Sequence, residues 1–326
     1  MTMTRTLRVG TRASLLARTQ TEHVVTALLT AHAGLAVDTV HVSTHGDRSA
    51  APLEQIGGTG VFVSALREAL LAGEIDMAVH SFKDLPTAPA DGIALAAVPT
   101  REDPRDALVA RGGRTLLDLP AGSTVGTGSP RRAAQLRALD LGLQIVPIRG
   151  NIDTRLGRVH GTADSPGDLD AVVLALAGLR RVGRDGGSEP LDPIQMLPAP
   201  AQGALAVECR AEDTELIELL SALDDRFTRA AVAAERSLLT ALEAGCTAPI
   251  GALAEVTEAD DPAPENPAAD VGYDIYLRGS VTAIDGSDAV RLSASGPLDT
   301  AEDVGRRLAA ELLDLGATTM MGISDE

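Results

Sequence analysis

Short strand patterns alternate with helical patterns along much of this chain, and this alternation strongly limits the folds open to it. The first strand patterns cover residues 7–10, 35–43 and 75–80, and the first helical patterns cover residues 14–31 and 61–72. The alternation returns between residues 123 and 174. Short strands separated by helices predict an α/β fold with two lobes, each built on a mostly parallel sheet.

Breaks in this pattern predict the domain boundaries. The charged segment 101–106, which contains Pro104, predicts a hinge at a first crossover. The proline-containing segment 197–202 predicts a second crossover that returns residues 204–209 to the first lobe as a strand. From about residue 225 the pattern changes to a long helix, several strands and a final helix, which is typical of a small α+β domain. We therefore expect domain 1 at residues 1–101 and 200–219, domain 2 at 102–199 and domain 3 at 220–326.

Charge and hydropathy exclude several classes of protein. Acidic residues outnumber basic ones by 46 to 28, so the net charge of −18 disfavours binding to nucleic acid or anionic membranes. No apolar run approaches ~18 residues and no signal peptide is evident, which predicts a cytoplasmic location. Excess acid with a single lysine indicates a salt-loving source, and we expect a halophilic archaeon; a GC-rich genome that favours arginine is the alternative.

Lys83 is the only lysine in the chain, and it directly precedes Asp84. Both follow the strand pattern at residues 75–80. Ligands of α/β proteins bind at the carboxyl ends of parallel strands, so this pair is a candidate for the functional site. The alternative is an ordinary surface lysine, and the spacing alone does not say whether Asp84 stabilises a cation or only pairs with Lys83.

Arginines occupy several positions where a strand pattern gives way to a helix. Ser129 and Pro130 are typical of a helix start, and two arginines follow them in the first turn. Cations there oppose the helix dipole by roughly 0.3–1 kcal/mol each, a conflict that an anionic ligand would relieve. The arginines at these corners are Arg12, Arg131, Arg132, Arg149 and Arg155. Their guanidinium groups predict a ligand with several carboxylates or phosphates, whereas ordinary surface ion pairs are the alternative.

The two cysteines differ in their surroundings. Cys246 follows a predicted helix between Gly245 and Pro249, in an exposed turn where a thiol can be modified. This local pattern alone does not decide between a functional role and an inert thiol for Cys246. Cys209 lies in an apolar strand pattern and is predicted to be an inert core residue. The histidines have no spacing typical of a metal site, so no metal is expected.

Seven sequence blocks together resemble the hydroxymethylbilane synthase (porphobilinogen deaminase) family. The blocks occur in the family's order and at its spacing, from about residue 7 to residue 315. They are residues 12–17, 79–86, 101–107, 126–132, 149–151, 154–156 and 243–246. The resemblance implies two lobes like those of periplasmic binding proteins and a third domain that carries a cofactor cysteine.

The resemblance also implies an activity. Members of the family join four porphobilinogen molecules head to tail, with loss of ammonia, on a covalent dipyrromethane primer. Hydroxymethylbilane is then released for tetrapyrrole synthesis (haem, sirohaem and cobalamin). The resemblance implies no metal, favours a monomer, and suggests that the product passes to uroporphyrinogen-III synthase.

Roles for individual residues follow from the same resemblance. Cys246 would hold the primer through a thioether, and Asp84, with Lys83, would act in catalysis. The other residues expected to hold the cofactor are Ser81, Lys83, Asp84, Thr127, Ser129, Arg131, Arg132 and Arg155. Those expected to bind the substrate or the growing chain are Arg12, Ser14, Arg149 and Arg181.

Several positions depart from the family's common pattern. Leu15 replaces a frequent proline, and Gly128 replaces a frequent serine, which removes a hydroxyl near the cofactor. Gln55 and Thr59 stand where many relatives carry lysine, so an anion-binding role for that glycine loop is not expected here. The acidic segment 258–270 is unusual and is interpreted as a surface loop.

Two other classes of protein compete with this interpretation. A non-catalytic two-lobed protein that binds carboxylates or other anions would explain the arginine corners but not Cys246. A ligand-sensing regulator would need a DNA-binding module, and neither a helix-turn-helix pattern nor a basic face is evident. A retained pyrrole adduct would exclude both.

Overall fold

The computed structural model describes residues 6–42, 60–162, 166–242, 248–259 and 272–321. The chain divides into two compact units. Unit 1 comprises Met1–Glu102 and Ala204–Arg229, and unit 2 comprises Asp103–Gly203 and Ala230–Glu326. Each unit is described by itself below. No helix in the described part of the chain is long and apolar enough to cross a membrane.

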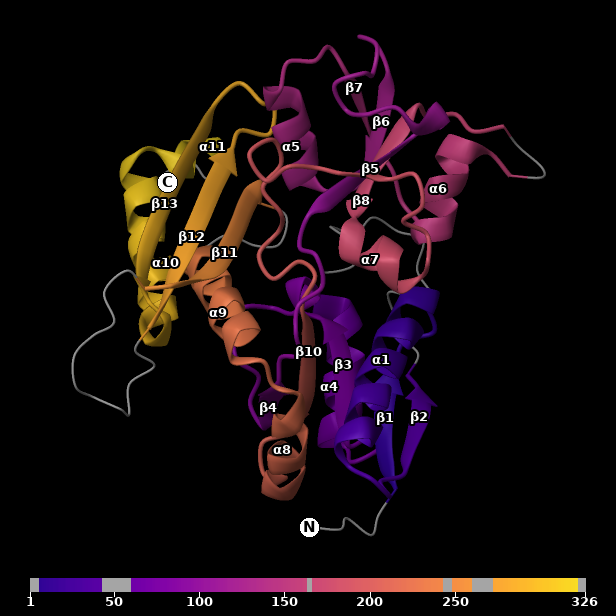
Figure 1. Cartoon of the computed structure of the whole chain (residues 1–326), viewed down its shortest axis with the longest axis vertical. Helices are drawn as coiled ribbons and strands as arrows, with labels where there is room; N and C mark the ends of the chain where they lie inside the picture. The colour runs from indigo at the N-terminus through magenta and orange to yellow at the C-terminus, as the bar shows by residue number, and fades with distance from the viewer. Residues whose placement is uncertain (1–5, 43–59, 163–165, 243–247, 260–271, 322–326) are drawn as a thin grey trace. The chain divides into compact units, whose positions relative to one another are not determined.

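Unit 1 is built on a five-stranded sheet. In hydrogen-bonding order its strands are β2 (Val37–His41), β1 (Leu7–Thr11), β3 (Met77–Ser81), β10 (Leu205–Arg210) and β4 (Ile93–Ala97). The first three strands run parallel, whereas β10 is antiparallel to both β3 and β4. Figure 1 shows β10 beside β3, so the second crossover does return the chain to the first lobe as predicted.

Helices cover both faces of this sheet. On one face α1 (Leu15–Ala31) and α8 (Thr214–Leu220) pack on an aliphatic core that includes Val24, Leu28 and Leu216. On the other face α4 (Gly60–Leu71) packs Leu66 and Leu70 on residues such as Ala78. Short 3-10 turns cover Phe82–Asp84 and Ser221–Leu223.

The first part of unit 2 repeats the strand order of unit 1, although the sequence shows no internal repeat. In hydrogen-bonding order its strands are β7 (Gln144–Pro147), β6 (Thr124–Thr127), β8 (Ala171–Ala175), β5 (Asp106–Ala110) and β9 (Glu189–Pro190). Three strands are again parallel, and β5 is antiparallel to both of its neighbours. The predicted two-lobed α/β class is therefore confirmed.

Three helices flank this second sheet. α5 (Pro130–Ala138) buries Leu136 against one face, whereas α6 (Ile152–His160) and α7 (Leu176–Arg181) bury residues such as Leu156 and Leu179 against the other. A 3-10 turn, Arg111–Gly113, follows β5. Because β6 leads into α5 and β7 leads into α6, the helix starts of α5 and α6 lie at one edge of the sheet.

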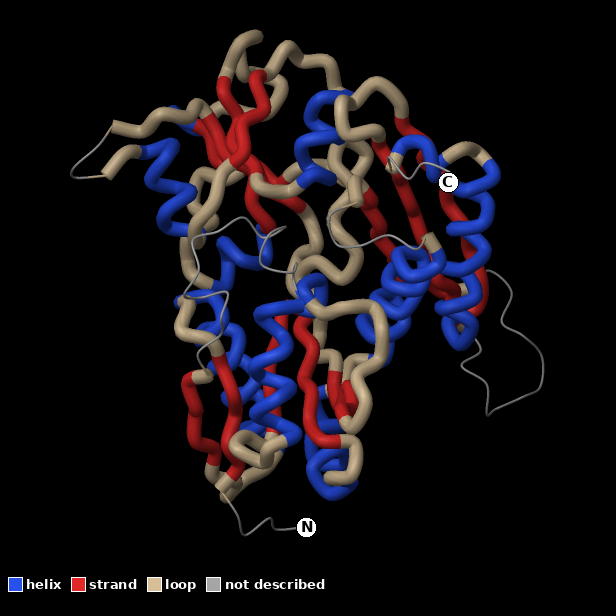
Figure 2. The backbone as a smooth tube through the Cα atoms, turned by 180° about the vertical axis from the view of Figure 1, so that it is seen from behind, coloured by secondary structure: helices blue, strands red, loops and turns tan. Residues whose placement is uncertain are grey.

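The rest of unit 2 is the small α+β domain expected from the sequence. Its strands form an antiparallel sheet in the order β11 (Ile250–Glu258), β12 (Tyr273–Thr282) and β13 (Ala289–Pro297). The helices are α9 (Arg226–Ala241), which begins in unit 1, α10 (Ala301–Asp314) and α11 (Ala317–Met320), with a 3-10 turn at Leu298–Thr300. A Cβ added at Gly279 of β12 would meet Leu238 of α9 and Leu308 of α10, so both helices cover one face of the sheet (Figure 2).

Candidate functional site

The turn that carries Lys83 and Asp84 extends directly from the end of β3. Ser81, the last residue of that strand, accepts a 2.8 Å hydrogen bond from Gln20 Nε2 of α1. The next backbone N–H, that of Phe82, donates to Ala204 O at 3.0 Å. Lys83 and Asp84 follow in a 3-10 turn and are both half-buried. The turn is therefore tied to α1 and to the start of β10.

Arg12 and Ser14 lie at the same edge of the unit 1 sheet. β1 and β3 are parallel neighbours, so the residues that follow the two strands lie at the same end of the sheet. Ser14 caps α1, since its Oγ accepts a hydrogen bond from Ala17 N at 3.3 Å. Unit 1 thus places four predicted site residues, Arg12, Ser14, Lys83 and Asp84, along one edge.

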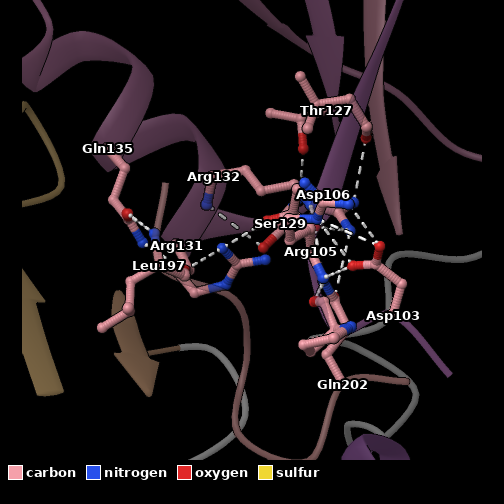
Figure 3. A network of polar contacts seen from close by, with 12 residues as sticks. Asp103, Arg105, Asp106, Thr127, Ser129, Arg131, Arg132, Gln135, Leu197 and Gln202 are labelled. Atoms are coloured by element: carbon pink, nitrogen blue, oxygen red, sulfur yellow. Dashed lines mark hydrogen bonds and ion pairs between the residues drawn. The ribbon is translucent and has the colours of Figure 1, made fainter. Parts of the chain in front are cut away.

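The corner between β6 and α5 in unit 2 has the cap predicted from the sequence. Ser129 Oγ accepts from Arg132 N at 3.4 Å, and Pro130 occupies the first turn. Thr127 Oγ1 accepts from Ser129 N at 3.2 Å, so this predicted hydroxyl also orders the turn (Figure 3). Arg131 and Arg132 follow and are buried, with 3% and 5% of their surfaces exposed.

Asp106 lies between these two arginines, a position that the sequence did not reveal. Its Oδ1 accepts from Arg132 Nε at 2.9 Å and from Nη2 at 2.7 Å, and Arg131 Nη1 lies 2.8 Å from its Oδ2 (Figure 3). Burial alone would raise the pKa of Asp106, but the two guanidinium charges hold it well below its usual value. We predicted a charged hinge at residues 101–106, whereas Asp106 begins the buried strand β5. The apolar run that follows it was the available signal.

The expectation that only an external anion balances these arginines was wrong, because Asp106 is an internal counter-ion for both. We expected an external anion to relieve the conflict between two cations and the helix dipole, but Asp106 already relieves part of it. Arg132 is held further by Val173 O, 3.0 Å from its Nη1, and by Gln202 Oε1, 3.4 Å from its Nη2. In Arg131, Nη1 also donates to Leu197 O at 2.7 Å.

Arg131 nevertheless keeps a donor for a ligand. Its Nε is buried and has no hydrogen-bond partner among the residues that the structure describes. A buried N–H without an acceptor costs free energy, by roughly 1–3 kcal/mol. An anionic oxygen placed at this atom would remove that cost, and Arg131 therefore fits a carboxylate-bearing ligand.

The corner between β7 and α6 adds further cations to the same sheet edge. Asn151 caps α6 by accepting from Thr154 N at 2.8 Å. Arg155 Nε donates to Gly150 O at 2.8 Å, and Arg149 is exposed. Burial lowers the pKa of Arg155, and repulsion from Arg132 and Arg149 lowers it further. This repulsion indicates a cluster of cations that a bound anion would stabilise.

Two other positions bear on this cluster. Arg181, at the end of α7, donates from Nη2 to Gly203 O at 2.7 Å. At Gly128 an added Cβ would lie only 2.6 Å from Ile148 O, so the backbone here leaves no room for the serine that is frequent in the family. The backbone that follows β7 therefore lies close against Gly128.

The Asp106 ion pairs make a prediction about acid stability. Because the pKa of Asp106 is lowered in the folded protein, its carboxylate stabilises the fold above the ordinary aspartate value of 3.8, and this contribution is lost as the pH falls below it. We expect Asp106→Asn to lose about 3–5 kcal/mol of unfolding free energy at pH 7, because the buried arginines lose their counter-ion. The variant's stability should also fall less steeply between pH 4 and 2. Equal slopes for both proteins in urea titrations would contradict this role.

Some predicted residues cannot be placed. Cys246, Gln55 and Thr59 lie outside the described residues. Cys209 is fully buried in β10, which confirms its predicted place in the core, and burial raises the pKa of its thiol to about 11. Within the described part of the chain, no group of three or more His, Cys, Asp or Glu could hold a metal ion.

Comparison with known families decides what this chain is. Residues 7–218 match the porphobilinogen deaminase dipyromethane cofactor binding domain, and residues 229–314 match the porphobilinogen deaminase C-terminal domain. The chain belongs to the porphobilinogen deaminase family. The porphobilinogen deaminase of Nocardia farcinica is 58% identical over 316 residues, which cover 97% of this chain and 88% of that protein. That of Mycobacterium marinum is 57% identical and covers 97% and 96%.

A solved structure shows a more distant likeness. The periplasmic aliphatic sulphonate binding protein SsuA from Escherichia coli is 18% identical and covers 74% of this chain and 71% of that chain, with a TM-score of 0.37. Family membership rests on the two domain matches, which together extend over both units of this chain.

Proposed function

We propose that this protein joins four porphobilinogen molecules head to tail, with loss of ammonia at each addition, and releases hydroxymethylbilane. The match to both porphobilinogen deaminase domains carries this proposal. The arginine corners support it, because porphobilinogen and every pyrrole ring of the product bear carboxylates that guanidinium groups bind well. The product serves tetrapyrrole biosynthesis.

The residues of unit 2 fit a dipyrromethane cofactor. Such a group, when bound, supplies the free pyrrole carbon to which the first substrate is joined. Its carboxylates would be held by Arg131, Arg132 and Arg155, and the buried Nε of Arg131 supports this assignment. Hydroxyl groups of Thr127 and Ser129 would add neutral hydrogen bonds. Cys246, outside the described residues, would form the thioether.

Asp84 is proposed as the catalytic carboxylate. Loss of ammonia from porphobilinogen leaves an electron-poor cation, and a fixed carboxylate near the pyrrole nitrogens stabilises such a charge. Asp84 can also accept the proton that leaves when the new carbon–carbon bond forms. Lys83 would neutralise a carboxylate of the cofactor, and Ser81 would donate a hydrogen bond to it. The anchoring of this turn to α1 and β10 supports a fixed position for Asp84.

Substrate recognition is proposed for a second set of residues. Arg12 and Ser14 follow β1 in unit 1, whereas Arg149 and Arg181 belong to unit 2. Arg149 is exposed, so its guanidinium group is accessible to a ligand carboxylate. The Ser14 hydroxyl accepts a hydrogen bond as the α1 cap and still has its own proton to donate.

We also propose the three-domain division given above: residues 1–101 with 200–219, residues 102–199, and residues 220–326. The three separate sheets and the break between the two domain matches at residues 218 and 229 support it. A monomer that acts in the cytoplasm and passes its product to uroporphyrinogen-III synthase would complete this account. The halophilic archaeal source stays a prediction, which the relatives from Nocardia and Mycobacterium do not support.

The reaction stoichiometry tests this function. Purified protein given porphobilinogen should release one ammonia for each porphobilinogen consumed and one hydroxymethylbilane for every four. Ammonia is measured by a coupled assay, and the product by its oxidation to a porphyrin. Saturable binding of porphobilinogen without ammonia release would instead favour a non-catalytic binding protein.

A further inference from the structure

A carboxylate is buried in the unit 1 sheet, outside every group of residues assigned above. Glu208 lies in the middle of β10, and only 3% of its surface is exposed. Arg67 of α4 donates two hydrogen bonds to its carboxylate, from Nε to Oε2 at 3.0 Å and from Nη2 to Oε1 at 2.6 Å. This bidentate geometry fixes both the helix and the strand.

His80 is the third member of this buried group. Its Nε2 lies 3.3 Å from Glu208 Oε2, a distance at which the protonated imidazole forms an ion pair with the carboxylate. In the β3–β10 ladder His80 is opposite Ala206, and Glu208 is opposite Ala78. Side chains alternate between the faces of a sheet, so His80 and Glu208 share the face that α4 covers. The triad Arg67–Glu208–His80 therefore joins one helix to two adjacent strands.

Stability alone does not account for this triad. Burial alone would raise the pKa of Glu208, but His80 and Arg67 lower it to about 2, so the carboxylate stays charged in the interior. Replacing a buried ion pair with apolar side chains of similar volume is often neutral or stabilising. A charged group held this tightly does, however, restrict the packing of its neighbours to one arrangement.

The neighbours restricted in this way lead into the proposed catalytic turn. His80 is followed by Ser81, and Asp84 stands only four residues after His80. Ser81 points to the opposite face of the sheet, where Gln20 holds it at 2.8 Å. The end of β3 is thus held on one face by α1 and on the other by the triad.

We propose that Glu208 is a positioning residue for the turn that carries Lys83 and Asp84. It holds His80, and through His80 the end of β3, so that the Asp84 carboxylate keeps a single position. The proposal rests on the catalytic role assigned to Asp84 above. It assigns Glu208 no contact with substrate or cofactor.

The test is Glu208→Gln, which keeps the size of the side chain but removes its charge. We expect kcat to fall by about 10- to 100-fold, as for small displacements of a reacting group, with KM changed less than about threefold. Intact mass should show a cofactor content equal to that of the wild type. The matched control is Leu216→Ala, which destabilises the opposite core of the same unit without touching the triad. Measured well below both unfolding temperatures, this control should keep a kcat close to the wild-type value.

Several outcomes would overturn the proposal. A kcat within twofold of the wild type for Glu208→Gln would do so, and so would an equal loss of kcat in Leu216→Ala. If Glu208→Gln does not fold, Arg67→Lys keeps the charge but loses the bidentate grip, and it should lower kcat at least fivefold; an unchanged kcat would exclude positioning. Failure of the proposed function is distinct, because the wild type itself would then release no ammonia. Failure of the role assigned to Asp84 is distinct as well, because Asp84→Asn would then keep near-normal turnover.

Discussion

Asp84→Asn should keep its fold and its cofactor but stop chain elongation. The amide keeps the shape of the side chain but can neither stabilise a cation as a carboxylate does nor accept a proton at neutral pH. Loss of a preorganised charge or a general base typically costs about 10²–10⁴ in rate, and we expect kcat to fall by roughly 10³-fold. Ammonia release in the steady state measures the loss.

The control for this variant is Asp91→Asn in the same unit. Asp91 is exposed and lies outside the turn, so its replacement should leave kcat unchanged. Circular dichroism and intact mass should match the wild type for both variants. Near-normal turnover by Asp84→Asn would refute the assigned role, whatever the control does.

Arg131→Leu should impair loading of the dipyrromethane. The variant loses the buried Nε that we assign to a cofactor carboxylate, and truncating one partner of a buried charge pair costs about 2–5 kcal/mol. That loss corresponds to at least a 30-fold weaker hold on the cofactor. The measurement is the fraction of purified protein that carries the mass of two pyrrole units, before and after incubation with porphobilinogen.

Loss of stability must be separated from loss of loading in this variant, since Arg131 also pairs with Asp106. Arg137→Leu is the control, because Arg137 lies on the same helix but is exposed. Urea titration gives the folded fraction of each variant, and occupancy is compared only among folded proteins. Full occupancy in folded Arg131→Leu would show that the cofactor does not depend on this guanidinium.

Local patterns in the sequence were sufficient for most of the fold. The expected strands at residues 7–10, 75–80 and 204–209 became β1, β3 and β10, because continuous apolar runs indicate buried strands. The cap Ser129 was visible because capping depends on residues only a few positions apart. Asp285 and Gly286, a pair typical of a tight hairpin turn, lie between β12 and β13, and Gly286 has a φ of 81°.

Long-range pairing was the part that the sequence could not supply. β4 and β5 were not predicted, since both are short and follow charged or proline-containing segments. Asp106 meets Arg131 and Arg132 across 25 and 26 positions of sequence, and no local pattern reports such a contact. Glu208 likewise lies in an apolar run, and only the register of β10 beside β3 brings it to His80.

The intact mass of the purified protein, beside that of Cys246→Ala, tests the central claim most directly. The mass of a covalently primed porphobilinogen deaminase should exceed the mass calculated from its sequence by two pyrrole units. This excess should be absent from Cys246→Ala. An unmodified wild type that gains no mass after incubation with porphobilinogen would contradict the account, as would an adduct that survives in Cys246→Ala.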